Sequence, residues 1–185
     1  ATIAGRIAIR ERLLSLSEAL TTFIQTLLVC AETHATTIMP DYTYLQHAQP
    51  TSLGHYLLSF VYPLVRDLDR LQACYARTNQ SPAGIGSING SRLPVDRRRL
   101  AELLGFSGAI HNTRDAMWQV DNPVELASLV TTILLHIDRL AEDLQIWNTA
   151  EFNLVELADR HARISLIMPQ KKNPYSLAFL RGLTG

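Results

Sequence analysis

The ten residues at positions 165–174 read Ser165-Leu166-Ile167-Met168-Pro169-Gln170-Lys171-Lys172-Asn173-Pro174, and the chain is organised around them. Their prolines and amides favour a polar loop, whereas the next residues favour a helix. Asn173 is predicted as the N-cap of that helix and Pro174 as its first residue, where a missing N–H costs nothing. Free N–H groups there, with two lysines beside them, would suit a carboxylate. The same spacing also fits an ordinary capped helix with a solvated lysine pair.

The composition limits the class of protein. The 185 residues are 47% hydrophobic, which is enough for a sizeable core and one domain. Lys and Arg number 17 and so do Asp and Glu, so no overall basic field attracts nucleic acid or anionic lipid. The cluster Arg97-Arg98-Arg99 stands near Asp96 and Glu102, which indicates a solvated helix face rather than a phosphate track.

The cysteines and the apolar runs indicate a cytoplasmic protein. Cys30 and Cys74 have neither disulfide-framework nor metal-ligand spacing, so both are expected as reduced, buried thiols. The apolar run around 57–65 contains Ser59 and Pro63 and falls short of the roughly 18 residues that span a bilayer. We therefore expect no membrane segment, and no signal peptide is visible.

Helical periodicity dominates the chain. Apolar residues recur at steps of three and four over 3–38, and Met39-Pro40 is predicted to end that helix. An irregular connection should follow at 43–50. Further helices are predicted from about 51 to 75, with a kink at Pro63, from 94 to 104, with Gly105 as its stop, and from 116 to 147, where Pro123 splits off the first turn. The fold class is therefore all-α, a bundle of long helices.

Two motifs in this order resemble the argininosuccinate lyase family of the fumarase/aspartase superfamily. The first is Thr43-Tyr44-Leu45-Gln46-His47-Ala48-Gln49-Pro50 and the second is the loop from Met168 to Pro174. Between them, Leu93-Pro94-Val95-Asp96-Arg97 and Ala101-Glu102-Leu103-Leu104-Gly105-Phe106 also resemble that family. Two motifs in the right order are far more specific than either alone. The glycine-rich stretch 81–94 fits a flexible linker by composition, but the continuing resemblance favours an ordered loop near the site.

The resemblance implies a fold and an activity. Residues 1–185 would be the central helical domain of a longer chain whose flanking parts lie outside this sequence. Members release fumarate from a succinylated amine without a cofactor, as homotetramers in which each active site draws on three subunits. We therefore expect a small dicarboxylate substrate, a homotetramer, and an isolated 185-residue piece that is inactive.

The family's site residues carry over by position. Ser165 matches the serine that acts as the base, Lys171 the cation that stabilises the developing dianion, and Asn173 a carboxylate ligand. Thr43 matches a residue that hydrogen-bonds the substrate. Gln46 and Gln170 are further candidates for substrate binding, although either amide also fits a role in tying loops together.

The chain departs from the family pattern at several positions. Ile164 and Leu166 replace a glycine and a second serine beside Ser165, which bears on the mobility of the loop. Tyr44 stands where the family has a histidine, and Ala178 where it has the glutamate that holds that histidine. Both halves of one charge pair are thus lost together, whereas losing one would leave the other unpaired. Thr43-Tyr44 together with Asn173-Pro174-Tyr175-Ser176-Leu177-Ala178-Phe179 resembles the ethylenediamine-disuccinate lyase branch, where Tyr44 would be a donor to a different substrate.

No histidine stands at metal-ligand spacing with two other ligands, so no metal is predicted.

The sequence leaves the function and the substrate open. A catalytically silent, crystallin-like structural homologue is the alternative function, favoured by the lost pair and opposed by the retained Ser165, Lys171 and Asn173. The amine that is released, the direction of the reaction and the pathway are not encoded in the motifs.

Overall fold

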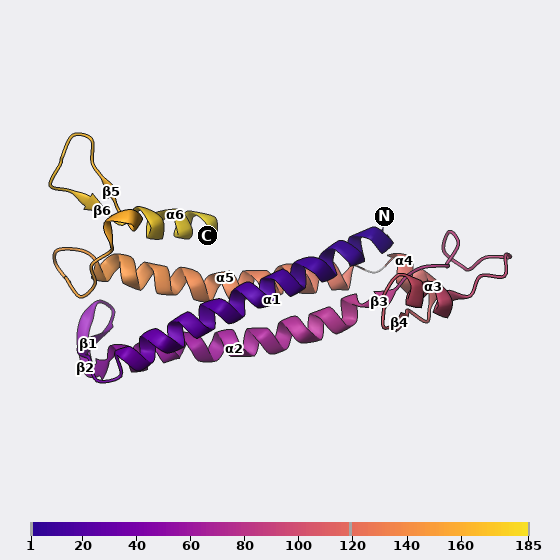
Figure 1. The fold of residues 1–185 in the computed structure, drawn as a ribbon, viewed down its shortest axis with the longest axis horizontal. Coiled ribbons are helices and arrows are strands. Elements are labelled where there is room, and N and C mark those ends of the chain that lie inside the picture. Colours follow the sequence, from indigo (N-terminus) through magenta and orange to yellow (C-terminus); the bar gives the residue numbers. More distant parts are fainter. Residues whose placement is uncertain (1, 119, 185) are drawn as a thin grey trace. The chain divides into compact units, whose positions relative to one another are not determined.

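The computed structural model describes residues 2–118 and 120–184, and helices make up most of it (Figure 1). This confirms the all-α prediction. The helices are α1 (Thr2–Thr33), α2 (Leu53–Thr78), α3 (Arg97–Leu103), α4 (Thr113–Trp118), α5 (Asp121–Trp147), α6 (Tyr175–Thr184) and the short 3-10 turn η1 (Asp159–His161). The strands are β1 (Ile38–Thr43), β2 (Gln46–Ser52), β3 (Gln80–Ser81), β4 (Gly108–Ala109), β5 (Arg163–Ile164) and β6 (Lys172–Asn173).

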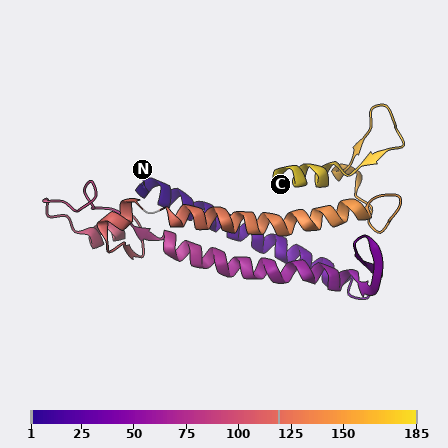
Figure 2. The same cartoon turned by 180° about the vertical axis from the view of Figure 1, so that it is seen from behind.

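The chain forms two compact units, and each of the three long helices contributes to both. Unit 1 comprises residues 1–24 and 65–129, and unit 2 comprises residues 25–64 and 130–185. Within each unit, segments of α1, α2 and α5 run alongside one another (Figures 1 and 2). Unit 1 buries Leu13, Leu20, Ile24, Leu71, Cys74, Ala83, Ile85, Ala101, Phe106, Ala116 and Leu129. Unit 2 buries Leu27, Ala31, Met39, Leu57, Phe60, Val61, Leu64, Ile133, Leu140, Ala141, Trp147 and Leu177.

A close crossing of α1 and α2 fixes the start of α2 in unit 2. The N–H of Gly54 donates to the carbonyl of His34 at 3.0 Å, just after α1 ends. A Cβ on Gly54 would press on the carbonyl oxygen of Ala31 and lie 2.8 Å from the Cα of Ala35. Ser52 caps the helix, because its Oγ accepts from the N–H of His55 at 3.1 Å. Only a residue without a side chain fits this crossing.

Arginine bonds fix the turn after α3 in unit 1. Asp96 caps α3 by accepting from the N–H groups of Arg98 and Arg99, and Gly105 ends it with a left-handed φ of 69°. Arg10 of α1 donates to the carbonyl of Gly105 and, at 2.6 Å, to Oδ1 of Asn79. The predicted stop at Gly105 is confirmed.

Three sequence-based boundaries were wrong. The helix predicted over 3–38 ends at Thr33, and the irregular connection at 43–50 is part of an antiparallel hairpin of β1 and β2. A two-residue turn lets 38–52 pair with itself, although Pro40 and Pro50 cannot donate hydrogen bonds. The single helix predicted over 116–147 is two, because α4 ends at Trp118 and α5 begins at Asp121. Pro123 lies inside α5, and position 119 falls outside the described residues.

The stretch 81–94 is an ordered loop rather than a linker. Ala83 and Ile85 are buried, and Gly86 pairs with Gly90 across a tight turn. The N–H of Ala83 donates to Oγ of Ser81 at 3.1 Å. The loop lies in unit 1.

Helix α1 is the one helix of the described residues that is long and apolar enough to cross a membrane, by length and composition alone. The apolar run at 57–65 lies in α2 instead. The core helix of a soluble protein passes the same test, so the finding is weak evidence of a membrane span. Only 22% of its apolar window is buried, which leaves most of that surface uncovered in this chain.

Gly54→Ala tests the helix crossing. The added Cβ forces α1 and α2 apart, so we expect the free energy of unfolding to fall by about 1–3 kcal/mol. Gly5→Ala is the matched control, because Gly5 is helical and exposed and a Cβ added there would meet nothing within 4 Å. This control should gain about 0.4–1 kcal/mol. Denaturant unfolding compares the two, and an equal effect of both substitutions would contradict the tight crossing.

Candidate functional site

The motif loop of unit 2 is closed by its own backbone. Strands β5 and β6 pair antiparallel, with Arg163 opposite Asn173 and Ile164 opposite Lys172. Inside this pair, the N–H of Ser165 donates to the carbonyl of Lys171 at 3.2 Å. The N–H of Lys171 donates to the carbonyl of Met168 at 2.9 Å and closes a turn. Positions 165 and 171 are therefore held next to each other at the neck of the loop.

The hydroxyl of Ser165 faces the inside of this loop. Its Oγ accepts a hydrogen bond from the N–H of Met168 at 3.2 Å, and the residue is half-buried. A backbone N–H directed at a hydroxyl oxygen stabilises the alkoxide more than the neutral form. Leu166 and Ile167, at the tip, are 99% and 89% exposed. The loop thus shelters the hydroxyl while its apolar tip stays in solvent.

The two adjacent lysines have different surroundings. The Nζ of Lys172 lies 2.8 Å from Oδ1 of Asp159 and 3.1 Å from Oε1 of Glu156. Hydrogen bonds to these carboxylates raise the pKa of Lys172, and the bond to Lys172 lowers the pKa of Asp159. Lys171 is exposed, and within residues 2–118 and 120–184 its ammonium has no ion pair. Lys171 is therefore the lysine whose charge is available to an anionic ligand.

Asn173 does not cap the helix, so that prediction was wrong. It lies in β6, and its side-chain N–H donates to the carbonyl of Arg163 at 3.1 Å. Helix α6 begins at Tyr175, and the carbonyl of Pro174 accepts its first bond, from Ala178. Pro174 thus occupies the cap position, because strand pairing draws Asn173 back onto β5. Asn173 holds the neck of the loop together, on the side where Ser165 and Lys171 meet.

Thr43, Tyr44 and Gln46 surround the turn of the β1–β2 hairpin. Thr43 pairs with Gln46, and Tyr44 and Leu45 between them have φ values of 53° and 59°. Two successive left-handed residues make the tight turn that matches strand twist, a position where Asn and Gly are preferred. The side chain of Tyr44 is 99% exposed. Thr43 and Gln46 are also exposed, and Gln170 lies exposed in the turn of the motif loop.

Aromatic contacts support the hairpin. The ring of Tyr42 lies 5.1 Å from that of His47 and 5.2 Å from that of Phe152, in the segment that follows α5. Below the hairpin, the hydroxyl of Tyr56 donates to Asp143 at 2.5 Å, and its ring lies 4.5 Å from that of Trp147. Burial and this bond raise the pKa of Tyr56, so it stays a neutral donor. These contacts tie the hairpin and α2 to the end of α5.

Polar contacts anchor helix α6 on α5. Arg181 donates to Oε1 of Glu142 at 2.8 Å, and the hydroxyl of Thr184 donates to Oδ1 of Asp138 at 2.8 Å. Leu177, on the first turn of α6, is buried. Since α6 continues directly from β6, these contacts also fix the carboxyl end of the motif loop. Ala178 is exposed on the same turn.

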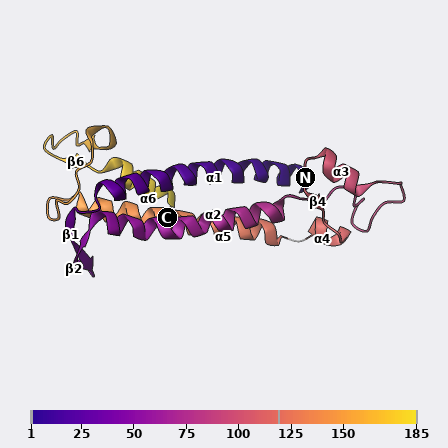
Figure 3. The same cartoon turned by 60° about the horizontal axis from the view of Figure 1, so that its bottom comes forward.

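The predicted site residues thus occupy two places in one unit. Ser165, Lys171, Asn173 and Gln170 belong to the motif loop, and Thr43, Tyr44 and Gln46 to the hairpin. Both lie at the same end of the unit 2 helix segments (Figures 1 and 3). Among the described residues, no hydrogen bond or ion pair joins these two groups.

Sequence analysis missed the residues that support the site. Tyr56, Phe152 and Arg181 read as ordinary helix or loop residues, since their partners are 39–110 positions away along the chain. The ion pairs of Lys172 with Glu156 and Asp159, called the clasp below, had a signal in the sequence, because both acidic residues precede the two lysines of the motif loop. Their pairing with Lys172 rather than Lys171 follows only from the register of β5 and β6.

Comparison with known families and sequences gives one consistent result. A family model described as lyase matches residues 1–185. Argininosuccinate lyase of Methanosarcina mazei is 43% identical over 180 residues, which are 97% of this chain and 37% of that protein. Argininosuccinate lyase of Geobacillus thermodenitrificans is 47% identical over 155 residues, 84% of this chain and 34% of that protein. The chain thus spans little more than a third of the curated relatives that it matches.

Solved structures share the same fold. The crystal structure of EDDS lyase in complex with formate matches with a TM-score of 0.97 and 36% identity, over 100% of this chain and 37% of that one. The 3-carboxy-cis,cis-muconate lactonizing enzyme from Pseudomonas putida matches with a TM-score of 0.79 and 27% identity, over 97% of this chain and 39% of that one. Because the first match covers the whole chain, it includes the helices, the hairpin and the motif loop.

Lys172→Gln tests the clasp on the motif loop. Without the ammonium of Lys172, strand β6 loses its ion pairs to Asp159 and Glu156, so the loop should open more often. We therefore expect the amides of Ser165 and Lys171 to exchange with deuterium a few-fold faster. Lys171→Gln is the control, because that side chain makes no ion pair with any described residue and its loss should leave exchange unchanged. Equal acceleration in both variants would exclude the clasp.

The clasp also has a pH window. The pKa of Asp159 is lowered from its usual 3.8, so its contribution is lost as the pH falls through that lowered value. The pKa of Lys172 is raised from its usual 10.5, so its contribution is lost as the pH rises through that raised value. Amide exchange corrected for its intrinsic pH dependence should therefore show the clasp intact across neutral pH.

Proposed function

The chain belongs to the lyase family whose model matches it from residue 1 to residue 185, and on this premise we propose that it carries the base of a carbon–nitrogen lyase. The reaction is β-elimination of fumarate from an N-substituted aspartate. Similarity to argininosuccinate lyases and to EDDS lyase supports this activity. The observation that carries the proposal is the neck of the motif loop, where the backbone pairs Ser165, whose hydroxyl accepts a hydrogen bond from an N–H, with Lys171, whose ammonium no described carboxylate neutralises.

The chemistry requires both groups. A base removes a proton from the carbon next to a carboxylate, and the electron pair moves into that carboxylate to give a dianion. The dianion then collapses, the carbon–nitrogen bond breaks, and fumarate and the amine leave, the amine taking up a proton. Cations and hydrogen-bond donors aimed at the dianion lower the barrier most, since charge develops there.

Ser165 is the proposed base. A serine hydroxyl is a weak base in water, so its alkoxide needs hydrogen-bond donors and a dry environment. The N–H of Met168 supplies one donor at 3.2 Å. Closure of the loop over substrate would cover the exposed Leu166 and Ile167 and exclude water from the hydroxyl.

Lys171 and Asn173 are proposed to face the substrate carboxylates. No described carboxylate neutralises the ammonium of Lys171, whereas its neighbour Lys172 is bound by two. Asn173 uses one amide N–H on the carbonyl of Arg163 and has a second available for a carboxylate oxygen. Thr43, Gln46 and Gln170 are exposed donors suited to the same ligand.

Tyr44 is proposed to select the amine. Its phenol is fully exposed at the turn of the hairpin and replaces a residue that would otherwise pair with a glutamate at position 178. Ala178 is exposed and leaves no carboxylate in that place. A phenol without a charged partner suits a substrate whose amine differs from that of argininosuccinate, such as a related aminopolycarboxylate.

A homotetramer in the cytoplasm is the proposed working state. Large apolar side chains stand exposed on the long helices and on α6, which a second copy would cover. They are Leu14, Leu28, Val29, Tyr62, Val65, Val124, Leu135, Phe179 and Leu183. A catalytically silent structural homologue is the competing proposal, because such a protein would keep these surfaces without needing Ser165.

Ser165→Ala separates the enzyme from the silent homologue. In the full-length protein we expect fumarate formation, followed by ultraviolet absorbance, to fall by at least about a hundredfold, since the general base is lost. The fold should persist, because Ala keeps the N–H that donates to Lys171 and removes only the acceptor for Met168. Activity equal to that of the parent would refute the role of Ser165, and a parent without activity on any succinylated amine would favour the silent homologue.

A panel of amines tests Tyr44. The full-length enzyme is incubated with argininosuccinate in the forward direction and with fumarate plus single amines in reverse. We expect turnover with an amine other than arginine, and Tyr44→Phe should raise KM for that amine more than it lowers kcat, because a binding hydroxyl is lost. Efficient turnover of argininosuccinate that is unaffected by Tyr44→Phe would contradict the proposed selection.

A further inference from the structure

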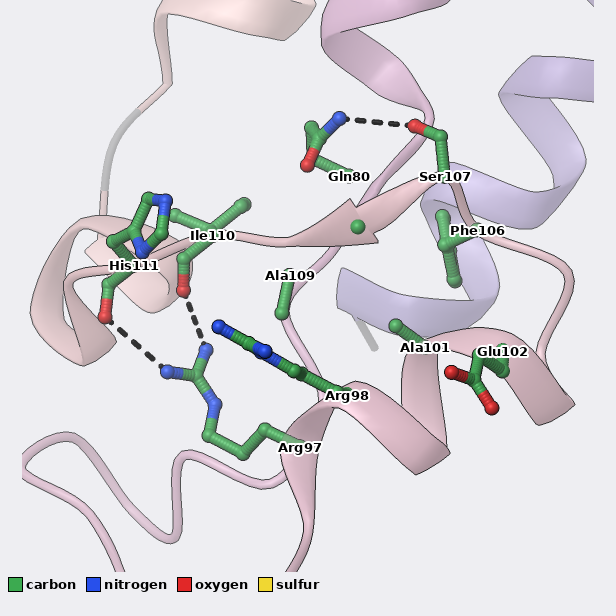
Figure 4. Close-up of a pocket in the computed structure, with 11 residues that line it drawn as sticks. Gln80, Arg97, Arg98, Ala101, Glu102, Phe106, Ser107, Ala109, Ile110 and His111 are labelled. Atoms are coloured by element: carbon green, nitrogen blue, oxygen red, sulfur yellow. Dashed lines mark hydrogen bonds between the residues drawn. The ribbon is translucent and has the colours of Figure 1, made fainter.

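Unit 1 contains a hollow of about 480 Å³ that the proposed lyase chemistry does not use (Figure 4). It lies between helix α3, the strand β4 and the segment that leads to His111. All its lining residues belong to unit 1: Gln80, Arg97, Arg98, Ala101, Glu102, Phe106, Ser107, Gly108, Ala109, Ile110 and His111. Its charged lining residues are Arg97, Arg98 and one carboxylate, that of Glu102.

Arg97 builds the wall of this hollow. Its guanidinium donates to three backbone carbonyls, those of Ala83 at 3.1 Å, Ile110 at 2.6 Å and His111 at 3.2 Å. The side chain therefore ties α3 to two loops that would otherwise be free to separate. The positive charge is not neutralised by these neutral acceptors, so it stays as a fixed field at the edge of the hollow.

The three consecutive arginines serve different purposes. Arg99 does not line the hollow, but it pairs at 3.0 Å with Glu102, which does, and so compensates that carboxylate. Arg98 extends across the hollow toward the segment of Ile110 and His111 (Figure 4). Within the described part of the chain its guanidinium has no acceptor. A second uncompensated cation thus faces the space that Arg97 borders.

Polar groups on the opposite wall are already oriented. The side-chain N–H of Gln80 donates to the hydroxyl of Ser107 at 3.0 Å, which leaves the hydroxyl proton of Ser107 to the carbonyl of Asn79 at 2.7 Å. A Cβ on Gly108 would lie 2.9 Å from Oε1 of Gln80, so a glycine here lets the Gln80 amide pack against the strand. His111 also lines the hollow. The parallel pairing of β3 and β4 fixes Gln80 beside Gly108.

We propose that this hollow is a binding site for a small oxyanion, a carboxylate or a phosphate, with Arg98 as its principal ligand. The planar guanidinium presents paired N–H groups that match either anion bidentately. The fixed charge of Arg97 attracts the anion without moving, and the hollow is too small for a polymer. The site is formed by unit 1 alone and does not depend on the lyase chemistry proposed for unit 2.

Arg98→Gln and Arg92→Gln form a matched pair that tests the site. Both remove one charge from an exposed arginine of unit 1, but Arg92 does not line the hollow and has no ion pair with a described residue. Inorganic phosphate and succinate are titrated separately into the full-length protein by calorimetry, in a Ser165→Ala background so that turnover is absent. We expect Arg98→Gln to weaken binding of one of the anions at least about tenfold and Arg92→Gln to change it less than about threefold.

The two probes distinguish the sources of the anion, since a preference for phosphate or for succinate identifies the chemical class. Thermal unfolding controls for loss of fold, which neither glutamine should cause. Equal weakening by both variants would reduce the effect to general electrostatics and overturn the proposal. So would the absence of any heat from either anion at millimolar concentration. Binding that persists when Ser165 is replaced, and is lost with Arg98, would support the site whether or not the lyase activity is found.

Discussion

The hydrogen bond from the N–H of Ser165 to the carbonyl of Lys171 is the constraint on which the functional end of unit 2 depends. Seven residues lie between the two short strands, and since no other described element covers them, their backbone groups pair only with one another or with solvent. Closing the neck at 165 and 171 pairs two of these groups, and it brings the backbone of Ser165 and Lys171 together. The contacts of Arg181 and Lys172 then hold the outer ends of the pair of strands.

Charge partition between sequence neighbours recurs in both units. Lys172 is compensated by Asp159 and Glu156, which leaves Lys171 as the available cation. Three backbone carbonyls occupy the guanidinium N–H groups of Arg97, and Arg99 pairs with Glu102, which leaves the guanidinium N–H groups of Arg98 without a partner among the described residues. In each case one member of a basic run is available because its neighbours already have partners.

The sequence predicted the helices, since periods of three and four residues survive over long stretches, and it predicted the loop through its motif. It did not predict the β1–β2 hairpin, because Pro40 and Pro50 argue against strands and the turn residues Tyr44 and Leu45 are not the usual Asn and Gly. Nor did it predict that Asn173 pairs with β5 rather than capping α6. Sequence-based prediction of a helix cap considers only neighbouring residues. Here the side chain of Asn173 instead bonds the carbonyl of Arg163, ten positions away, and the carbonyl of Pro174 accepts the first bond of the helix.

The turn of the β1–β2 hairpin indicates a role of Tyr44 beyond folding. Two residues with side chains in the left-handed region cost on the order of 1 kcal/mol each, which glycine or asparagine would avoid. The phenol recovers none of this within the chain, because its side chain is 99% exposed. Packing of the hairpin is supplied instead by Tyr42, which contacts His47 and Phe152. An exposed aromatic residue kept at a strained position is best explained by a ligand or a second copy of the chain that meets it there.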